Sequence, residues 1–345
     1  MNFCSDNVTG VAPEILAALA AANHGSAPSY GDDEITALLS KRFAEIFEHD
    51  VTVFPMVSGT AANALALASI MPPWGAVFCH ADAHIATHEC GAIEFYSGGG
   101  RVTGIASPHG KITASQLASL LPGGKGLVYA SQPSAVSITQ ATEAGTVYTL
   151  AEIAEIGEIA RAHDLALHMD GARFANALVS LGASPADITW KAGVDVLSFG
   201  ATKNGAMAAE ALIFFDEERA ATCAFRRMRA GHLLSKMRFI SAQLGAYLTD
   251  DLWLRNARHA NAMAGRLATG LTEVPGVTLR HPAEANEVFA ELPEAMIAHL
   301  LASGFQFHGW GGNCIRLVTA FNTLPADVDA FIRKHAYEPT YRGLI

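Results

Sequence analysis

The pattern of apolar and polar residues divides the chain into three stretches. In the first stretch, a helix begins at Pro13, and a second, amphipathic helix is capped by Asp32 or Asp33. The turn between these helices presents Tyr30. Both helices precede the first strand signal, so we expect them to form an N-terminal segment ahead of a sheet.

From Val51 the pattern becomes strand, turn and helix in repetition. Short apolar runs predict strands at Val51–Val57, Ala76–Cys79, Gly126–Ala130, Val136–Thr139, Leu165–Met169, Val194–Phe199 and Ala211–Phe215. Helical spacing predicts helices at Ala61–Ile70, Leu150–His163 and Phe174–Leu181. Strands that alternate with helices favour a mostly parallel α/β sheet, which binds ligands at the carboxyl ends of its strands.

Beyond Ala220 the rhythm changes again. The pattern predicts two long helices at Ala220–Leu248 and Trp253–Val274. Shorter elements follow, at Val277–Arg280, Val288–Leu292, Pro293–Ser303, Phe305–Phe307 and Ile315–Ala320, with a last helix from Ala326. We therefore expect a large α/β domain with its N-terminal segment over residues 1–240, and a small C-terminal α+β domain over residues 241–345.

Composition narrows the class of protein. The chain has 345 residues, of which 50% are hydrophobic, and a formal net charge of −10. Its length and apolar content indicate a globular protein, and its acidic charge argues against nucleic acid as a partner. No apolar run reaches the length of a membrane helix, the N-terminus has no secretion signal, and the five cysteines are scattered. We therefore expect a cytoplasmic protein.

Lys203 and Asp170 are the first candidates for chemistry. Lys203 follows a buried strand on a turn of small residues, where partial desolvation suits an amine that forms a Schiff base. Asp170 lies at the tip of an earlier strand, so the two side chains could face one crevice. That pair is what pyridoxal 5'-phosphate (PLP) requires. The alternatives are a solvated loop lysine and a structural ion pair of Asp170 with Arg173 or Lys203.

Three further groups carry candidate chemistry. Ser58, Gly59 and Thr60 form a strand-to-helix turn that could bind a phosphate, although an ordinary capped turn has the same sequence. Arg316 in an apolar strand could hold a carboxylate or form a structural salt bridge. His84 belongs to a His- and Cys-rich stretch, but this stretch lacks H-E-x-x-H and paired cysteines. We therefore expect no metal there, and a histidine that stacks on a planar cofactor or moves protons.

Together these motifs resemble the threonine aldolase family of fold-type-I PLP enzymes, especially its bacterial branch with L-phenylserine aldolase and low-specificity L-threonine aldolases. The resemblance covers nearly the whole chain. The segments that carry it are Ser5–Asn7, Tyr30–Asp33, Ser58–Asn63, His84, Ser137–Glu143, His168–Arg173, Thr189–Gly205, Arg229–Ala242 and Arg316.

The resemblance implies a role for each matched residue. It implies that Lys203 binds the cofactor covalently. Asp170 would pair with the ring nitrogen of the cofactor, and Arg173 would bond its phenolic oxygen. His84 would stack on the ring or relay a proton. The phosphate end would be bound by Ser58, Gly59, Thr60 and Thr202, and the substrate carboxylate by Ser5 and Arg316. Relatives of this kind are usually homotetramers whose subunits share sites, and Tyr30 would then reach a neighbour's site.

One position departs from the family pattern. Many threonine aldolases carry a histidine near the substrate hydroxyl, and Glu143 takes that place here. The group that accepts the β-hydroxyl proton is therefore left open between His84, Glu143 and a water between them.

The expected reaction is reversible retro-aldol cleavage of an L-β-hydroxy-α-amino acid, such as L-threonine, L-allo-threonine or L-phenylserine, to glycine and an aldehyde. The alternatives are another PLP lyase or an aminotransferase acting on a small amino acid, and a non-catalytic PLP- or metal-binding protein.

Overall fold

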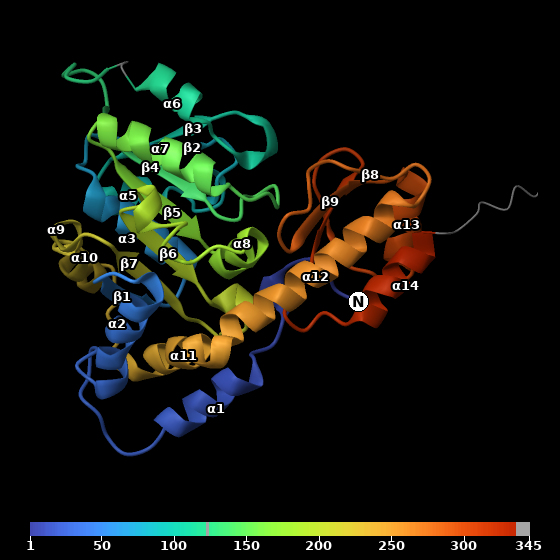
Figure 1. The fold of residues 1–345 in the computed structure, drawn as a ribbon, viewed down its shortest axis with the longest axis horizontal. Helices are drawn as coiled ribbons and strands as arrows, with labels where there is room; N and C mark the ends of the chain where they lie inside the picture. The colour runs from blue at the N-terminus through green and yellow to red at the C-terminus, as the bar shows by residue number, and fades with distance from the viewer. Residues whose placement is uncertain (122–123, 336–345) are drawn as a thin grey trace, which may run out of the picture.

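A seven-stranded sheet forms the centre of the larger part of the molecule in the computed structural model, which describes residues 1–121 and 124–335 (Figure 1). The strand order is β1-β7-β6-β5-β4-β2-β3. Strands β2 to β6 pair in parallel, whereas β7 runs antiparallel to its neighbours β6 and β1. The bounds are β1 Thr52–Met56, β2 Gly75–His80, β3 Arg101–Ile105, β4 Gln132–Thr139, β5 Ala166–Gly171, β6 Val196–Gly200 and β7 Glu210–Phe214. The expected mostly parallel α/β sheet is confirmed.

Several helices of this part begin where the sequence supplies capping side chains. Asp33 caps α2, Ser58 caps α3, and Thr149 forms a capping box with Glu152 at α7. The bounds are α1 Pro13–Ala22, α2 Glu34–Phe47, α3 Gly59–Ile70, α4 His84–Thr87, α5 Ala92–Ser97, α6 Ala114–Leu120, α7 Leu150–Ala162, α8 Phe174–Leu181, α9 Glu217–Ala220, α10 Cys223–Arg229 and α11 Arg238–Leu248. Among the described residues, no helix is long and apolar enough to cross a membrane.

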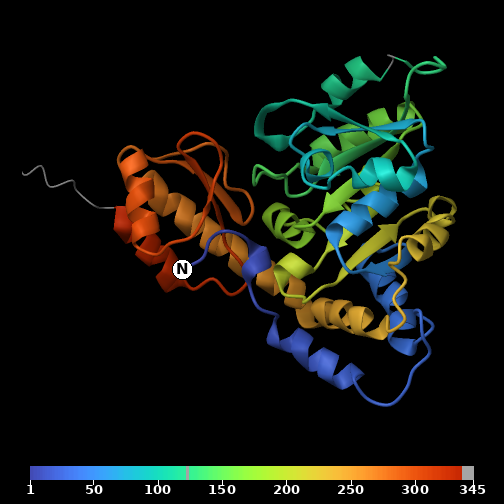
Figure 2. The same cartoon turned by 180° about the vertical axis from the view of Figure 1, so that it is seen from behind.

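The smaller part is an antiparallel four-stranded sheet with three helices. Its strand order is β10-β11-β9-β8. The bounds are α12 Leu252–Thr272, β8 Thr278–Leu279, β9 Glu287–Glu291, α13 Glu294–Ala302, β10 His308–Gly309, β11 Cys314–Val318 and α14 Pro325–His335. The N-terminus lies beside this part (Figures 1 and 2), and Phe3 is buried in its core.

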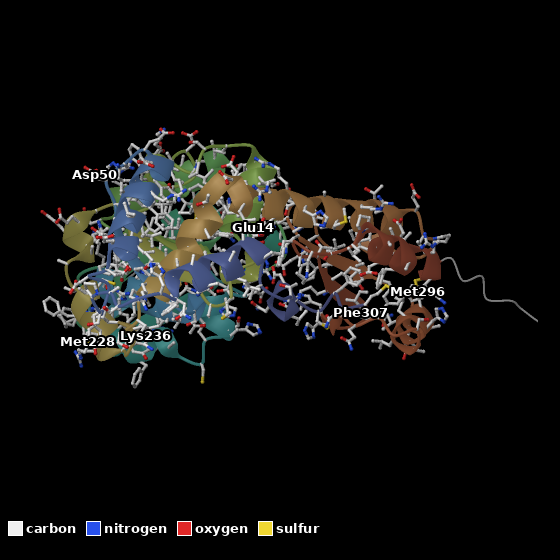
Figure 3. All side chains as sticks on the ribbon, turned by 90° about the horizontal axis from the view of Figure 1, so that it is seen from below. Glu14, Asp50, Met228, Lys236, Met296 and Phe307 are labelled. Atoms are coloured by element: carbon white, nitrogen blue, oxygen red, sulfur yellow. The ribbon has the colours of Figure 1, made fainter. Side chains whose placement is uncertain are left out.

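Helix α12 joins the two parts. Trp253 and Ala257 near its start belong to the large core, and Met263 to Leu271 belong to the small one. Seen from below, the molecule is elongated, with Met228 and Lys236 at one end and Met296 and Phe307 at the other (Figure 3). A domain boundary at residue 240 stays a prediction, and its C-terminal domain extends beyond the described residues.

Three predicted elements are wrong. Gly126–Ala130 is a series of turns, because Val128 and Tyr129 are exposed and the Gln132 amide bonds the carbonyls of this loop. The predicted helix Ala220–Leu248 is interrupted after α10, where Gly231 at φ +76° ends the helix.

The predicted strand Phe305–Phe307 is displaced to β10. Gln306 instead exchanges backbone hydrogen bonds with the N-terminal residues Met1 and Phe3. A contact so distant in sequence leaves no local signal.

Candidate active site

One cavity of about 330 Å³ lies where the carboxyl ends of the parallel strands meet. Its walls come from the N-terminal segment, helix α3, the ends of β4 and β5, the segments after β1, β2, β4, β5 and β6, and the start of β7. The lining residues are Asn7, Val57, Ser58, Gly59, Thr60, Asn63, His84, Glu89, Thr139, Ala141, Glu143, Asp170, Ala172, Arg173, Thr202, Lys203 and Glu210.

The cavity contains nine of the twelve residues that the sequence analysis named. These are Ser58, Gly59, Thr60, His84, Glu143, Asp170, Arg173, Thr202 and Lys203. The other three, Ser5, Tyr30 and Arg316, lie outside its lining. Tyr30 is 51% exposed on the turn between α1 and α2.

The loop that carries Lys203 is held from both sides. Asn204 donates one hydrogen bond to the Tyr247 hydroxyl at 2.7 Å and another to the Trp253 carbonyl at 2.8 Å. Gly205 adopts φ +116°, a conformation that favours glycine. Before the lysine, the Ala201 N–H donates to Oε2 of Glu210 at 2.8 Å. These contacts fix the backbone on either side of Lys203.

Asp170 lies on β5, the parallel neighbour of β6. Its Oδ1 accepts a hydrogen bond from the Ala172 N–H at 3.0 Å, and its Oδ2 accepts one from Asn63 Nδ2 at 2.8 Å. The residue is buried, so these two donors stabilise the carboxylate in place of water.

The turn Ser58–Thr60 begins helix α3, as expected for an anion site. The Ser58 hydroxyl accepts a hydrogen bond from the Ala61 N–H at 3.3 Å. The first N–H groups of a helix have no acceptor within the helix, and the helix dipole favours an anion there. A Cβ atom at Gly59 would meet no atom within 4 Å, so the turn is open on this side.

Glu143 is a buried carboxyl group at the cavity wall. Its Oε1 accepts hydrogen bonds from the His84 N–H at 2.7 Å and from the Thr139 hydroxyl at 3.0 Å. Burial, with a further contribution from Asp170, raises the pKa of Glu143 to about 7. Its Oε2 is buried and has no hydrogen-bond partner in the described part of the chain. This residue can therefore gain or lose a proton near neutral pH.

His84 forms a pair with Glu89. Nδ1 of His84 lies 2.9 Å from Oε1 of Glu89, and this hydrogen bond raises the pKa of the imidazole. The His84 side chain is 43% exposed, whereas that of Glu89 is fully buried. His84 can therefore exchange protons with solvent while its partner cannot.

An ion-pair network connects the cavity with the small part of the molecule. Arg173 binds Asp6 through Nε at 2.8 Å and Glu287 through a terminal nitrogen at 3.1 Å. Burial opposes its charge, but the two carboxylates hold the pKa of Arg173 above its usual value. Glu287 also lies 3.9 Å from Arg316, which donates to the Cys4 carbonyl at 3.2 Å. Arg316 therefore lies beside Ser5 and is connected to the cavity through Glu287 and Arg173.

In the described part of the chain, the donors present do not form a metal centre. Within residues 1–121 and 124–335, no group of three or more His, Cys, Asp or Glu side chains is placed to hold a metal ion. In the stretch that prompted the metal alternative, Cys79 is buried, and burial raises the pKa of its thiol to about 12. A metal binds the thiolate, so this residue is a poor ligand.

Three buried polar residues that line the cavity, Asn63, Glu89 and Glu210, had no predicted role. Asn63 is a buried amide in an otherwise small and apolar helix, and Glu210 is a charged residue at the start of an apolar strand. Burial raises the pKa of Glu210 to about 7. A lone polar residue in a buried element was the signal available for both. For Glu89, the only signal in the sequence was its position beside histidines.

The donor set fits PLP. The cavity offers an amine at Lys203, a carboxylate at Asp170 and a helix N-terminus at Ser58–Thr60, which match the cofactor's aldehyde, ring nitrogen and phosphate. Three buried atoms of lining residues, Asn63 Oδ1, Glu89 Oε2 and Glu143 Oε2, have no hydrogen-bond partner within the described chain. Unpaired polar atoms of this kind mark a site that receives a polar ligand.

Comparisons with known proteins agree with this description. The beta-eliminating lyase family model matches residues 2–295. The chain is 46% identical to the low specificity L-threonine aldolase of Pseudomonas aeruginosa over 90% of this chain and 89% of that protein. It is 43% identical to the low specificity L-threonine aldolase of Pseudomonas sp. strain NCIMB 10558 over 94% of each chain. A solved threonine aldolase structure from Leishmania major superposes with a TM-score of 0.91 at 31% identity, covering 97% of this chain and 98% of that one.

Proposed function

This chain belongs to the beta-eliminating lyase family, and we propose that it acts as a low-specificity L-threonine aldolase. It cleaves L-β-hydroxy-α-amino acids of the L-threonine, L-allo-threonine and L-phenylserine type reversibly to glycine and an aldehyde, with PLP as cofactor. The observation that carries the proposal is that Lys203 and Asp170 line one cavity together with the anion-binding turn Ser58–Thr60.

PLP, when bound, supplies an electron sink for cleavage of the bond between Cα and Cβ. We assign its covalent attachment to Lys203 and its ring nitrogen to Asp170. Arg173 donates hydrogen bonds to Asp6 through Nε and one terminal nitrogen, and its other terminal nitrogen forms the ion pair with Glu287, which leaves donors for the phenolic oxygen. The phosphate group is assigned to the turn after β1 and the one after β6, at Ser58, Gly59, Thr60 and Thr202.

We assign the proton of the substrate's β-hydroxyl to the carboxylate of Glu143. Two contacts fix Oε1 of this group, and its pKa, raised to about 7, allows proton transfer near neutral pH. His84 then passes the proton to solvent, because its ring lines the cavity and is also partly exposed.

The substrate's α-carboxylate is assigned to Arg316 with Ser5. Arg316 donates to the residue before Ser5, and its Nε has no hydrogen-bond partner among the described residues. A guanidinium and a hydroxyl placed together suit a carboxylate. Held in this way, the substrate would have its Cα–Cβ bond oriented for cleavage.

The oligomeric state and the location in the cell are further parts of the proposal. We place the protein in the cytoplasm as a homotetramer in which Tyr30 completes the cavity of a neighbouring subunit. The exposure of Tyr30 outside its own cavity supports the shared site, and five free cysteines support a reducing compartment. Light scattering of the purified protein tests the tetramer.

The test of the function is product analysis. The purified protein, saturated with PLP, is incubated with L-threonine, L-allo-threonine and both L-phenylserine diastereomers, and glycine and aldehyde are quantified. Stoichiometric glycine and aldehyde support the proposal. Keto acid with ammonia would indicate elimination, and a keto acid formed with an amino acceptor would indicate transamination; either as the main outcome overturns it.

A further inference from the structure

A chain of three hydrogen bonds connects His84 with Asp170 through two residues that have no role in the scheme above. Glu89 Oε1 lies 2.9 Å from His84 Nδ1 and also accepts a hydrogen bond from Asn63 Nδ2 at 2.9 Å. The same nitrogen of Asn63 donates to Asp170 Oδ2 at 2.8 Å. Both hydrogens of the Asn63 amide are thus used, and one amide bridges two carboxylates.

The backbone holds Glu89 in this position. Cys90 and Gly91 follow it at φ +52° and +72°, so two consecutive residues adopt the left-handed conformation. A non-glycine residue such as Cys90 adopts this conformation at an energetic cost, and such residues concentrate at functional sites. The turn leaves Cys90 exposed while the Glu89 side chain is buried against His84 and Asn63.

We propose that Glu89 is a positioning residue for His84, which fixes the imidazole with its proton on Nδ1 and leaves Nε2 as the basic atom offered to the cavity. The inference rests on the proposed function, because that atom is the one that would carry the substrate proton to solvent. Glu89 is an acceptor at Nδ1, so the neutral ring keeps its proton there.

Other charged groups around His84 also affect the protonation of its imidazole. Asp170 favours the charged imidazole, and Lys203 opposes it. Glu143 accepts the His84 backbone N–H, and the ring of His88 stacks on that of His84 with centroids 5.6 Å apart. Of these groups, Glu89 is the one hydrogen-bonded to the ring of His84.

The test is a pH titration of the histidine ring nitrogens by long-range ¹H–¹⁵N NMR of the holoenzyme labelled with ¹⁵N-histidine. The His84→Asn variant assigns the His84 signals among the 14 histidines. In the wild type we expect Nδ1 to stay protonated while Nε2 titrates. In Glu89→Gln we expect the titration midpoint of His84 to fall by about one pH unit, since the amide can accept from Nδ1 but carries no charge. Glu94→Gln, which removes an exposed carboxylate from helix α5, leaves the midpoint unchanged.

Two results overturn the proposal. One is a neutral His84 in the wild type with its proton on Nε2, a result that does not depend on whether Glu89→Gln folds. The other is an unchanged midpoint in Glu89→Gln. Threonine cleavage is measured on the same samples: a normal His84 response without cleavage contradicts the proposed function alone, whereas cleavage without the response contradicts the role of Glu89 alone.

Discussion

Replacing Glu143 by glutamine should change the free energy of unfolding and the rate of catalysis in opposite directions. Glutamine has the shape of a protonated glutamic acid, and its carbonyl can accept from the His84 N–H and the Thr139 hydroxyl as Oε1 does now. Its amide cannot take a proton from the substrate. We therefore expect Glu143→Gln to stabilise the protein at alkaline pH and to lower turnover.

The magnitude of the stability change follows from the raised pKa of Glu143. The folded protein holds this carboxyl near 7, against an ordinary value of 4.5. Because the pKa of Glu143 is higher in the folded state, this carboxyl ionises first in the unfolded state. The stability that it contributes below pH 4.5 is therefore lost as the pH rises toward 7. The shift corresponds to about 3 kcal/mol. The variant is thus expected to exceed the wild type in free energy of unfolding by about 1 kcal/mol at pH 5 and by about 3 kcal/mol at pH 8.

The assay is urea unfolding of the cofactor-free protein at pH 5 and pH 8, at one fixed subunit concentration. Glu158→Gln, which removes an exposed carboxylate on α7, controls for the loss of charge alone. In parallel, kcat for L-threonine cleavage is expected to fall between about 100- and 10,000-fold, the usual effect of a general base. A stability gain that does not grow between pH 5 and pH 8 would contradict the raised pKa of Glu143, and a kcat within threefold of the wild type would contradict its role as the base.

Three further substitutions test the site and its support. Arg173→Ala leaves Asp6 and Glu287 buried without this cation, and urea unfolding should show a free energy of unfolding lower by about 3–5 kcal/mol. The control Arg266→Ala removes a more exposed ion pair and should cost less than about 1 kcal/mol. Asp170→Asn should lower kcat by about 100-fold or more with little change in the urea midpoint of unfolding. A kcat that falls only together with a clear drop in this midpoint would contradict the assignment of Asp170 to the cofactor. Gly157→Ala places a Cβ 2.2 Å from the Ala192 carbonyl oxygen and should destabilise by about 1–3 kcal/mol, whereas a neutral effect would show that α7 can shift.

The periodicity of the chain was sufficient to predict the elements that carry the site. The predicted strands around Leu167 and Leu197 are β5 and β6, and their parallel pairing brings Asp170 and Lys203 to one edge. Each of these strands is a short apolar run in a region of alternating strands and helices, so local pattern and global position agree. The placement of Lys203 and Asp170 at one edge of the sheet was therefore predictable.

Contacts between residues distant in sequence were not predictable. Val128 and Tyr129 have the composition of a strand, yet the side chain of Gln132 fixes their loop in turns. Asn63 meets Glu89 across 26 positions and Asp170 across 107, and no spacing rule relates them. The polar residues that support a site are recognisable only when the fold has brought their partners together.

The lysine that holds the cofactor is the decisive feature of the proposed site. The holoenzyme is reduced with borohydride, digested, and its peptides are identified by mass spectrometry. We predict that the reduced cofactor is found on the peptide that contains Lys203, the residue at the end of β6 that lines the cavity with Asp170. Cofactor fixed to a different lysine, or absent from every peptide of a protein that still cleaves L-threonine, would contradict the account.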